Sequence, residues 1–125
     1  MSDTQSESEQ TKALLQDRYG PKVRPVAYIC HLPRITAKAR EFGYAIAVHG
    51  SLQRDMDLIA APWSDVATDE DELLKAICET VGGFLLADEK GCDKPHGRRA
   101  WVIHFGAGMW MDLSIMPRIV AGGKP

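Results

Sequence analysis

Two aspartates have the residue type and spacing expected of a divalent-metal site. Asp55 and Asp57 flank Met56 at the start of the apolar run from 55 to 61. Because side chains alternate across a strand, both carboxylates should lie on one face of a sheet. Like charges this close repel each other, and a divalent cation would offset the repulsion. The pair therefore indicates a site for a hard cation, whose usual ligands are oxygens.

A third aspartate, Asp112, lies in the middle of the β-prone run from 109 to 116. A charged side chain within such a run is costly to bury unless it faces water, a charged partner or a metal ion. If this strand lay beside the one that begins at Asp55, three carboxylates would converge. Such a cluster is used for metal-assisted phosphoryl or nucleotidyl transfer. The alternative is that all three acids are solvated side chains on the open face of a sheet.

These acids belong to a longer ordered pattern, which reads His49-Gly50-Ser51, then Asp55-Met56-Asp57-Leu58, then Met111-Asp112-Leu113. The pattern resembles the fingerprint of the polymerase-beta-like nucleotidyltransferases. The resemblance implies a palm-like core in which a Gly-Ser turn contacts the nucleotide phosphates and three acids bind two Mg²⁺ ions. Gly50 and Ser51 would take the first role. The metal-binding and catalytic role would fall to Asp55, Asp57 and Asp112.

The activity implied by the resemblance is transfer of a nucleoside monophosphate from an NTP to an unidentified hydroxyl-bearing acceptor. Mg²⁺ would be the cofactor, with Mn²⁺ as a substitute. Asp55 and Asp57 would hold both ions, and Asp112 would help to activate the attacking hydroxyl. Arg54 is a candidate for binding the triphosphate, or it balances the charge of the acids beside it. Lys94, His96, Arg98 and Arg99 are further phosphate-binding candidates, although an ordinary solvated loop is the simpler interpretation.

One departure from the family pattern lies between Ser51 and Asp55. The family usually has a helical turn or more at this point, whereas only three residues intervene here, which cannot form a stable helix. A tight loop is expected instead, and a second, helical substrate domain is not expected. Either the acceptor is small, or a protein partner or second copy supplies the missing part. The remaining alternatives are an inactive nucleotide-binding or regulatory module, and a plain structural domain.

The order of the helices and strands expected to position these residues predicts an α+β domain, with helices on one face of a mixed, largely antiparallel sheet. Helices are predicted at 11–19, 33–42 and 69–81, the last with Thr68 as its N-cap. Strands are predicted at 44–49, 55–61, 84–87, 99–105 and 109–116, the last two as a hairpin in which His104 pairs with Trp110. Residues 23–30 contain Pro25 and are predicted to be an extended segment or an edge strand. Residues 88–97 are predicted to form a polar loop. The three tryptophans, Trp63, Trp101 and Trp110, are interpreted as core residues.

The composition predicts one domain: a disordered tail at 1–10, a nucleotidyltransferase-like domain at 11–120 and a loose tail at 121–125. The net charge of −2 gives no general attraction to nucleic acid or to an anionic membrane. The three cysteines form no C-x-x-C pair and are interpreted as reduced thiols. With neither a signal peptide nor a long apolar segment, the protein is expected to be cytoplasmic.

Overall fold

The computed structural model describes residues 6–10, 24–52, 55–106 and 108–118. Its helices are α2 (Arg24–Glu41) and α3 (Glu70–Val81), with a short 3-10 helix η1 (Pro95–Gly97). Its strands are β1 (Tyr44–His49), β2 (Met56–Pro62), β3 (Cys92–Asp93), β4 (Arg99–Phe105) and β5 (Met109–Ile115). Residues 7–10 form a separate helical turn near the N-terminus.

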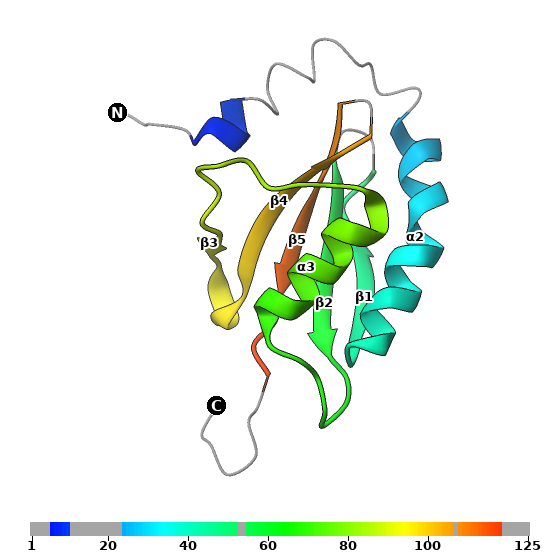
Figure 1. Cartoon of the computed structure of the whole chain (residues 1–125), viewed down its shortest axis with the longest axis vertical. Helices are drawn as coiled ribbons and strands as arrows, with labels where there is room; N and C mark the ends of the chain where they lie inside the picture. The colour runs from blue at the N-terminus through cyan, green and yellow to red at the C-terminus, as the bar shows by residue number, and fades with distance from the viewer. Residues whose placement is uncertain (1–5, 11–23, 53–54, 107, 119–125) are drawn as a thin grey trace.

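The five strands form one sheet in the order β1-β2-β5-β4-β3 (Figure 1). Strands β2 and β5 are parallel, whereas the other three neighbouring pairs are antiparallel. The predicted α+β class and the mixed, largely antiparallel sheet are therefore confirmed. The chain also brings His104 opposite Trp110 in the β4–β5 hairpin, as predicted.

Helices α2 and α3 cover the same face of this sheet and enclose the hydrophobic core. In β2 the core side chains are Met56, Leu58 and Ala60, which are fully buried. The intervening residues point to the other face, because side chains alternate along a strand. Each large apolar side chain buried in this way contributes about 1.5–3 kcal/mol to folding. Core packing on one face therefore leaves the opposite face of β2 for Asp57.

The prediction of an extended segment at 23–30 is wrong, because α2 begins at Arg24 and continues through Pro33. Tyr28, Ile35 and Ala39 are fully buried at helical spacing, and their packing against the core favours one long helix. Pro25 lies in the first turn, where the amide hydrogens have no acceptor within the helix, so it does not disrupt the hydrogen bonding. The two prolines therefore did not mark the helix boundaries that the sequence alone indicated.

The predicted N-cap of α3 is wrong by one residue. Asp69, not Thr68, caps the helix, because its side chain accepts a hydrogen bond from the amide of Glu72. The Thr68 carbonyl instead accepts the Tyr44 hydroxyl at 2.6 Å, and the Thr68 amide donates to the carbonyl of Phe42. These tertiary contacts hold Thr68 against the end of α2 and β1.

Three further predictions differ from the structure. The strand expected at 84–87 is reduced to a single bridge between Phe84 and His104. The loop expected at 88–97 contains the short edge strand β3 and the 3-10 helix η1. Trp63 is 83% exposed rather than part of the core, because it follows the last residue of β2 and lies in the connection to α3. The helix predicted at 11–19, Arg54 and the tail at 121–125 lie outside the described residues.

Two general features of the chain can also be read from the described residues. None of the helices in these ranges is long and apolar enough to cross a membrane. All three cysteines are free, with Cys30 and Cys92 exposed and Cys78 partly buried in α3.

Candidate metal centre and its pocket

The pairing of β2 with β5 brings the three aspartates together. Asp57 and Asp112 are direct neighbours across the parallel pair, and Asp55 immediately precedes β2. One carboxylate oxygen from each of the three residues lies within 4.8 Å of the others, and each side chain is half-buried. The sequence predicted that the three acids would converge if these two strands were neighbours. The strands are neighbours, and the acids converge.

Asp55 is held in place by a residue of the neighbouring strand. The indole Nε1 of Trp110 donates a hydrogen bond to Asp55 Oδ1 at 2.9 Å. Trp110 is fully buried, so its ring has one orientation available to it. The hydrogen bond therefore positions the Asp55 carboxylate on the same side of the sheet as the other two.

The Gly50-Ser51 turn lies directly beside the carboxylates. His49 pairs with Asp57 across β1 and β2, which places Gly50 next to the Asp57 side chain. A Cβ atom added to Gly50 would lie 2.9 Å from Asp57 Oδ2, and the backbone there has a φ of +85°. Leu52 also has a positive φ, of 63°, and residues 50–52 are not helical. Residues 50–52 thus form a non-helical turn, and only glycine fits its closest approach to the site. Residues 53 and 54, which complete the spacer, lie outside the described residues.

The donor set fits a divalent metal ion. Three carboxylate oxygens gathered in a small volume repel one another, and a hard cation both offsets the repulsion and prefers oxygen ligands. Within the described residues, no other three His, Cys, Asp or Glu side chains come this close together. Asp55, Asp57 and Asp112 could therefore hold a metal ion between β2 and β5.

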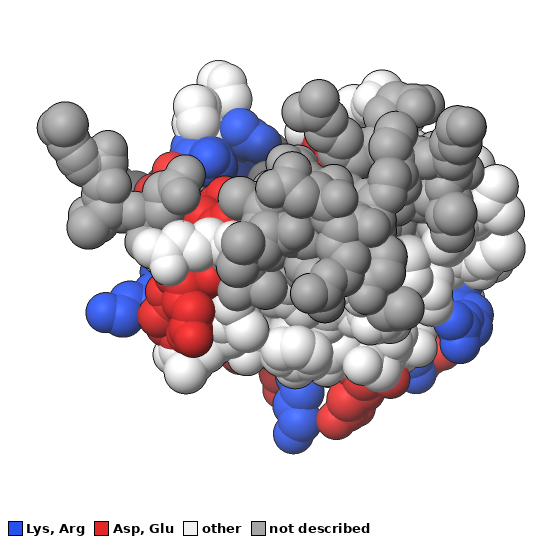
Figure 2. All heavy atoms as spheres, turned by 90° about the horizontal axis from the view of Figure 1, so that it is seen from above, with Lys and Arg blue, Asp and Glu red and all other residues white. Residues whose placement is uncertain are grey.

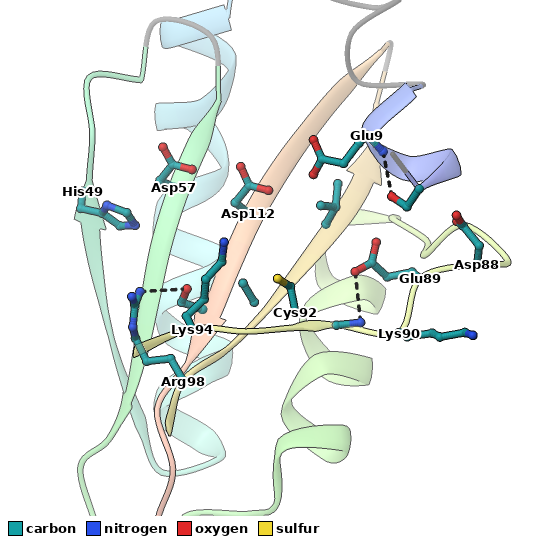
Figure 3. A pocket seen from close by; sticks show the side chains of 15 residues that line it. Glu9, His49, Asp57, Asp88, Glu89, Lys90, Cys92, Lys94, Arg98 and Asp112 are labelled. Atoms are coloured by element: carbon teal, nitrogen blue, oxygen red, sulfur yellow. Dashed lines mark hydrogen bonds between the residues drawn. The ribbon is translucent and has the colours of Figure 1, made fainter. Parts of the chain in front are cut away.

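A cavity of about 730 Å³ opens over this face of the sheet. Its floor includes Asp57 and Asp112, together with small or apolar side chains of β4 and β5 (Figure 3). One wall comes from the segment around β3 and η1, including Lys94 and Arg98. This volume is in the range typical of sites for small molecules. The candidate metal centre thus borders a pocket large enough for a substrate.

Part of another wall comes from a segment that the sequence analysis did not connect with the site. Ser6 and Glu9, from the region predicted to be a disordered tail, line the pocket. The Ser6 hydroxyl accepts a hydrogen bond from the Glu9 amide at 3.1 Å, and the Asp88 carboxylate accepts one from the Glu7 amide. A serine followed three residues later by glutamate is a capping-box signal. That local signal could have identified the turn, although not its place against the pocket.

The charged side chains on the surface agree with the nearly neutral composition. Figure 2 shows Lys and Arg in separate groups on the visible surface rather than as one continuous basic area. Lys94 and Arg98, in the pocket wall, are one such local group of basic side chains.

Comparisons with known proteins include a similarity to a solved structure. No family model and no curated protein matches the sequence. The chain is similar to the solved structure of the Cid1 poly(U) polymerase with MgGTP bound, at 16% identity and a TM-score of 0.46. The match covers 88% of this chain but only 38% of that chain, so this chain spans well under half of the polymerase. Function is therefore inferred from the geometry of the side chains themselves.

Proposed function

We propose that this protein is a metal-dependent nucleotidyltransferase of the polymerase-beta-like type, which transfers a nucleoside monophosphate from an NTP to a hydroxyl acceptor. The observation that carries the proposal is the cluster of three carboxylates within 4.8 Å, of which Asp57 and Asp112 line a pocket, beside a Gly-Ser turn. Strand pairing fixes the positions of these groups before any substrate binds. Such preorganisation is a major source of rate enhancement in phosphoryl-transfer chemistry.

Asp55, Asp57 and Asp112 are the metal ligands in this proposal, with Mg²⁺ as the ion and Mn²⁺ as its substitute. When bound, the divalent ions neutralise charge on the phosphates and make the attacking hydroxyl more acidic. Asp55 and Asp57 hold the ions. A carboxylate oxygen of Asp112 accepts the proton of the acceptor hydroxyl. The hydroxyl oxygen then forms a bond to the α-phosphorus, and the bond from that phosphorus to the bridging oxygen breaks. Pyrophosphate leaves with the electron pair.

The Gly50-Ser51 turn binds the nucleotide phosphates in this scheme. Gly50 has no side chain to obstruct the space beside Asp57, so the backbone of the turn can approach a phosphate there. The Ser51 side chain is exposed and has a hydroxyl that can donate to a phosphate oxygen. Arg54 is a further candidate for the triphosphate, on the basis of its place in the sequence.

The tight turn also favours a second candidate function, a nucleotide-binding or regulatory module without catalysis. Residues 50–52 form no helical turn, and two of them have a positive φ. A turn of this kind offers fewer backbone amides to a triphosphate than a helix N-terminus does. The module would bind Mg²⁺ and NTP but release no pyrophosphate in the presence of any acceptor.

A thermal melt with and without Mg²⁺ or Mn²⁺ and each NTP tests the shared core of both functions. A ligand that binds only the folded state raises the melting temperature. The rise is expected in the wild type and in Asp65→Asn, a control at an exposed acid in the β2–α3 connection, but not in Asp57→Asn. A wild type that shows no rise with any NTP would refute the metal–nucleotide site. Pyrophosphate release then separates the enzyme from the binding module.

A further inference from the structure

The pocket has a basic side that the metal centre does not use. Lys94 and Arg98 line the same cavity as Asp57 and Asp112, and both come from the segment around η1. In Figure 3 the Lys94 side chain extends toward these two carboxylates, whereas Lys90 extends away from them. Two cations, both among the phosphate-binding candidates named from the sequence, thus lie near the acids.

Arg98 is oriented by neutral groups. Its Nε donates to the carbonyl of Pro95 at 3.1 Å, and its Nη1 donates to Ser114 Oγ at 3.3 Å. Among the described residues, no carboxylate forms an ion pair with it. The guanidinium is therefore held in place without losing its positive charge, and it retains further N–H donors for an anion. Ser114 follows Asp112 by two residues in β5, so its side chain lies on the same face of the sheet as the metal centre. The Arg98 guanidinium that donates to it lies on that face too.

The neighbouring arginine, Arg99, differs from Arg98 because it contacts a carboxylate. Arg99 lies 3.7 Å from a carboxylate oxygen of Asp93 and donates to the carbonyl of Lys90 at 2.8 Å. Its guanidinium carbon also lies 5.5 Å from the ring centre of Trp101. The contacts of Arg99 are thus all within the protein, and they tie the edge of the sheet together. Arg99 thus has a carboxylate partner, whereas Arg98 has none among the described residues.

Lys94 likewise forms no ion pair with a described acid. Its side chain is exposed, and within the described ranges no carboxylate lies at ion-pair distance from its ammonium group. Two of the acids that line the pocket accept hydrogen bonds from backbone amides instead. Asp88 accepts the amide of Glu7, and Glu89 accepts the amide of Gly91 at 3.3 Å. The positive charge of Lys94 is thus available to a ligand in the cavity.

The order of the strands places this basic side away from the Gly50-Ser51 turn. The turn follows β1, at one edge of the sheet, and the Lys94–Arg98 segment joins β3 to β4, at the other edge. Asp112 lies on β5, between the two. If the nucleotide phosphates lie at the turn, the basic side of the cavity is open for a second substrate to approach Asp112. A cavity of about 730 Å³ suits a small molecule there.

We infer that Lys94 and Arg98 form a subsite for a phosphate group of the acceptor, which is therefore a small phosphorylated compound with a free hydroxyl. This inference rests on the proposed function, because that function supplies the role of Asp112 and the place of the nucleotide. Lys94 contributes a point charge, and Arg98 contributes oriented N–H donors that match phosphate oxygens. The phosphate fixes the acceptor with its hydroxyl toward Asp112.

The first test is a titration of metal-free protein with inorganic phosphate at low ionic strength, followed by two-dimensional amide NMR. Wild-type protein should show saturable shifts around η1. Lys94→Ala and Arg98→Gln should each weaken the fitted affinity about tenfold, since each removes a charge-assisted contact. The matched controls are Arg99→Gln, whose guanidinium is used internally, and Lys75→Ala, an exposed lysine on α3. Equal weakening in the controls, or none in the pocket variants, would overturn the subsite.

The second test separates this subsite from the metal–nucleotide site. Asp57→Asn should keep phosphate binding, because it removes a repelling negative charge, but should lose the response of the melting temperature to Mg²⁺ and NTP. Lys94→Ala should show the reverse pattern. If Lys94→Ala also lost the Mg²⁺–NTP response, the subsite would belong to the nucleotide and the acceptor assignment would be wrong. Phosphate binding in a wild type that gives no Mg²⁺–NTP response would overturn the proposed function, and the acceptor assignment with it.

Discussion

The Nε1–H of Trp110 donates a hydrogen bond to Oδ1 of Asp55 at 2.9 Å, across the parallel pair β2 and β5. Trp110 is fully buried, whereas Asp55 is half-buried and belongs to the cluster of three acids. A carboxylate has two oxygens and several lone pairs, so this bond leaves acceptor capacity for a cation. A buried residue on the acid-bearing face of β5 thus orients a ligand of the candidate metal centre.

Replacing Trp110 with phenylalanine removes the indole N–H and retains an aromatic ring. Loss of such a supporting hydrogen bond typically weakens metal binding about 10-fold to 100-fold, and we expect Mn²⁺ affinity to fall by about the lower figure. Electron paramagnetic resonance of free Mn²⁺ measures it. Trp101→Phe is the matched control, because Trp101 Nε1 donates to Glu70 Oε2 at 2.8 Å, away from the site. Equal losses of Mn²⁺ affinity in the two variants would contradict a specific role for Trp110.

Substitution of Gly50 by alanine should abolish metal binding. The added Cβ would lie 2.9 Å from Asp57 Oδ2, and the φ of +85° is unfavourable for alanine. The backbone strain costs about 1–2 kcal/mol of stability. Gly82→Ala is the control: Gly82 also has a positive φ, of +65°, but a Cβ there meets nothing within 4 Å. Both variants should melt lower than the wild type, and only Gly50→Ala should lose Mn²⁺ binding in a calorimetric titration.

Stability should fall as the pH drops below about 6.5, the ordinary pKa of histidine, and His31 should contribute to this fall. Burial lowers the pKa of His31, and the positive charge of Arg34 lowers it further. Arg34 Nη2 lies 2.8 Å from His31 Nδ1 and can donate a hydrogen bond to this nitrogen when the ring is neutral. The unfolded chain therefore binds the proton more tightly than the folded one, so stability is lost between the unfolded and the folded pKa.

Chemical denaturation at about pH 5 and about pH 7.5, either side of that pKa, measures this effect. His31→Gln should be less sensitive to pH than the wild type, since glutamine does not titrate. The exposed His96, in η1, provides the control His96→Gln, which should keep the wild-type pH dependence. The same pH dependence in His31→Gln as in the wild type would show that other groups are responsible.

The three cysteines should differ in their rates of alkylation. Burial, with a smaller effect from the charge of Glu79, raises the pKa of the Cys78 thiol to about 11. At about pH 8, only about one in a thousand such thiols is the reactive thiolate. Cys30 and Cys92 are exposed. Mass spectrometry after iodoacetamide treatment should show two labels quickly and a third only after unfolding. In Cys78→Ala the third label should be absent, and rapid addition of three labels to the native wild type would contradict the prediction.

The elements predicted with success are those whose sequence pattern is complete within a short window. The strands at 44–49 and 99–105 alternate or are continuously apolar and end at turn-forming glycines. The helix α2 was mispredicted at its start, because Pro25 and Pro33 are strong local signals against a helix. Packing of Tyr28 and Ile35 against the sheet outweighs those signals, and that contribution depends on residues distant in the chain.

Alternation of side chains along one strand is enough to predict that Asp55 and Asp57 share a face. The three-residue spacer after Ser51 also indicates a turn too short to contain a stable helix. Only the tertiary structure decided that β5 lies parallel beside β2, so that Asp112 and Trp110 join the first two acids. It alone placed Lys94 and Arg98 across a pocket from them. Strand pairing and pocket walls depend on the packing of distant segments, which periodicity within a single segment does not encode.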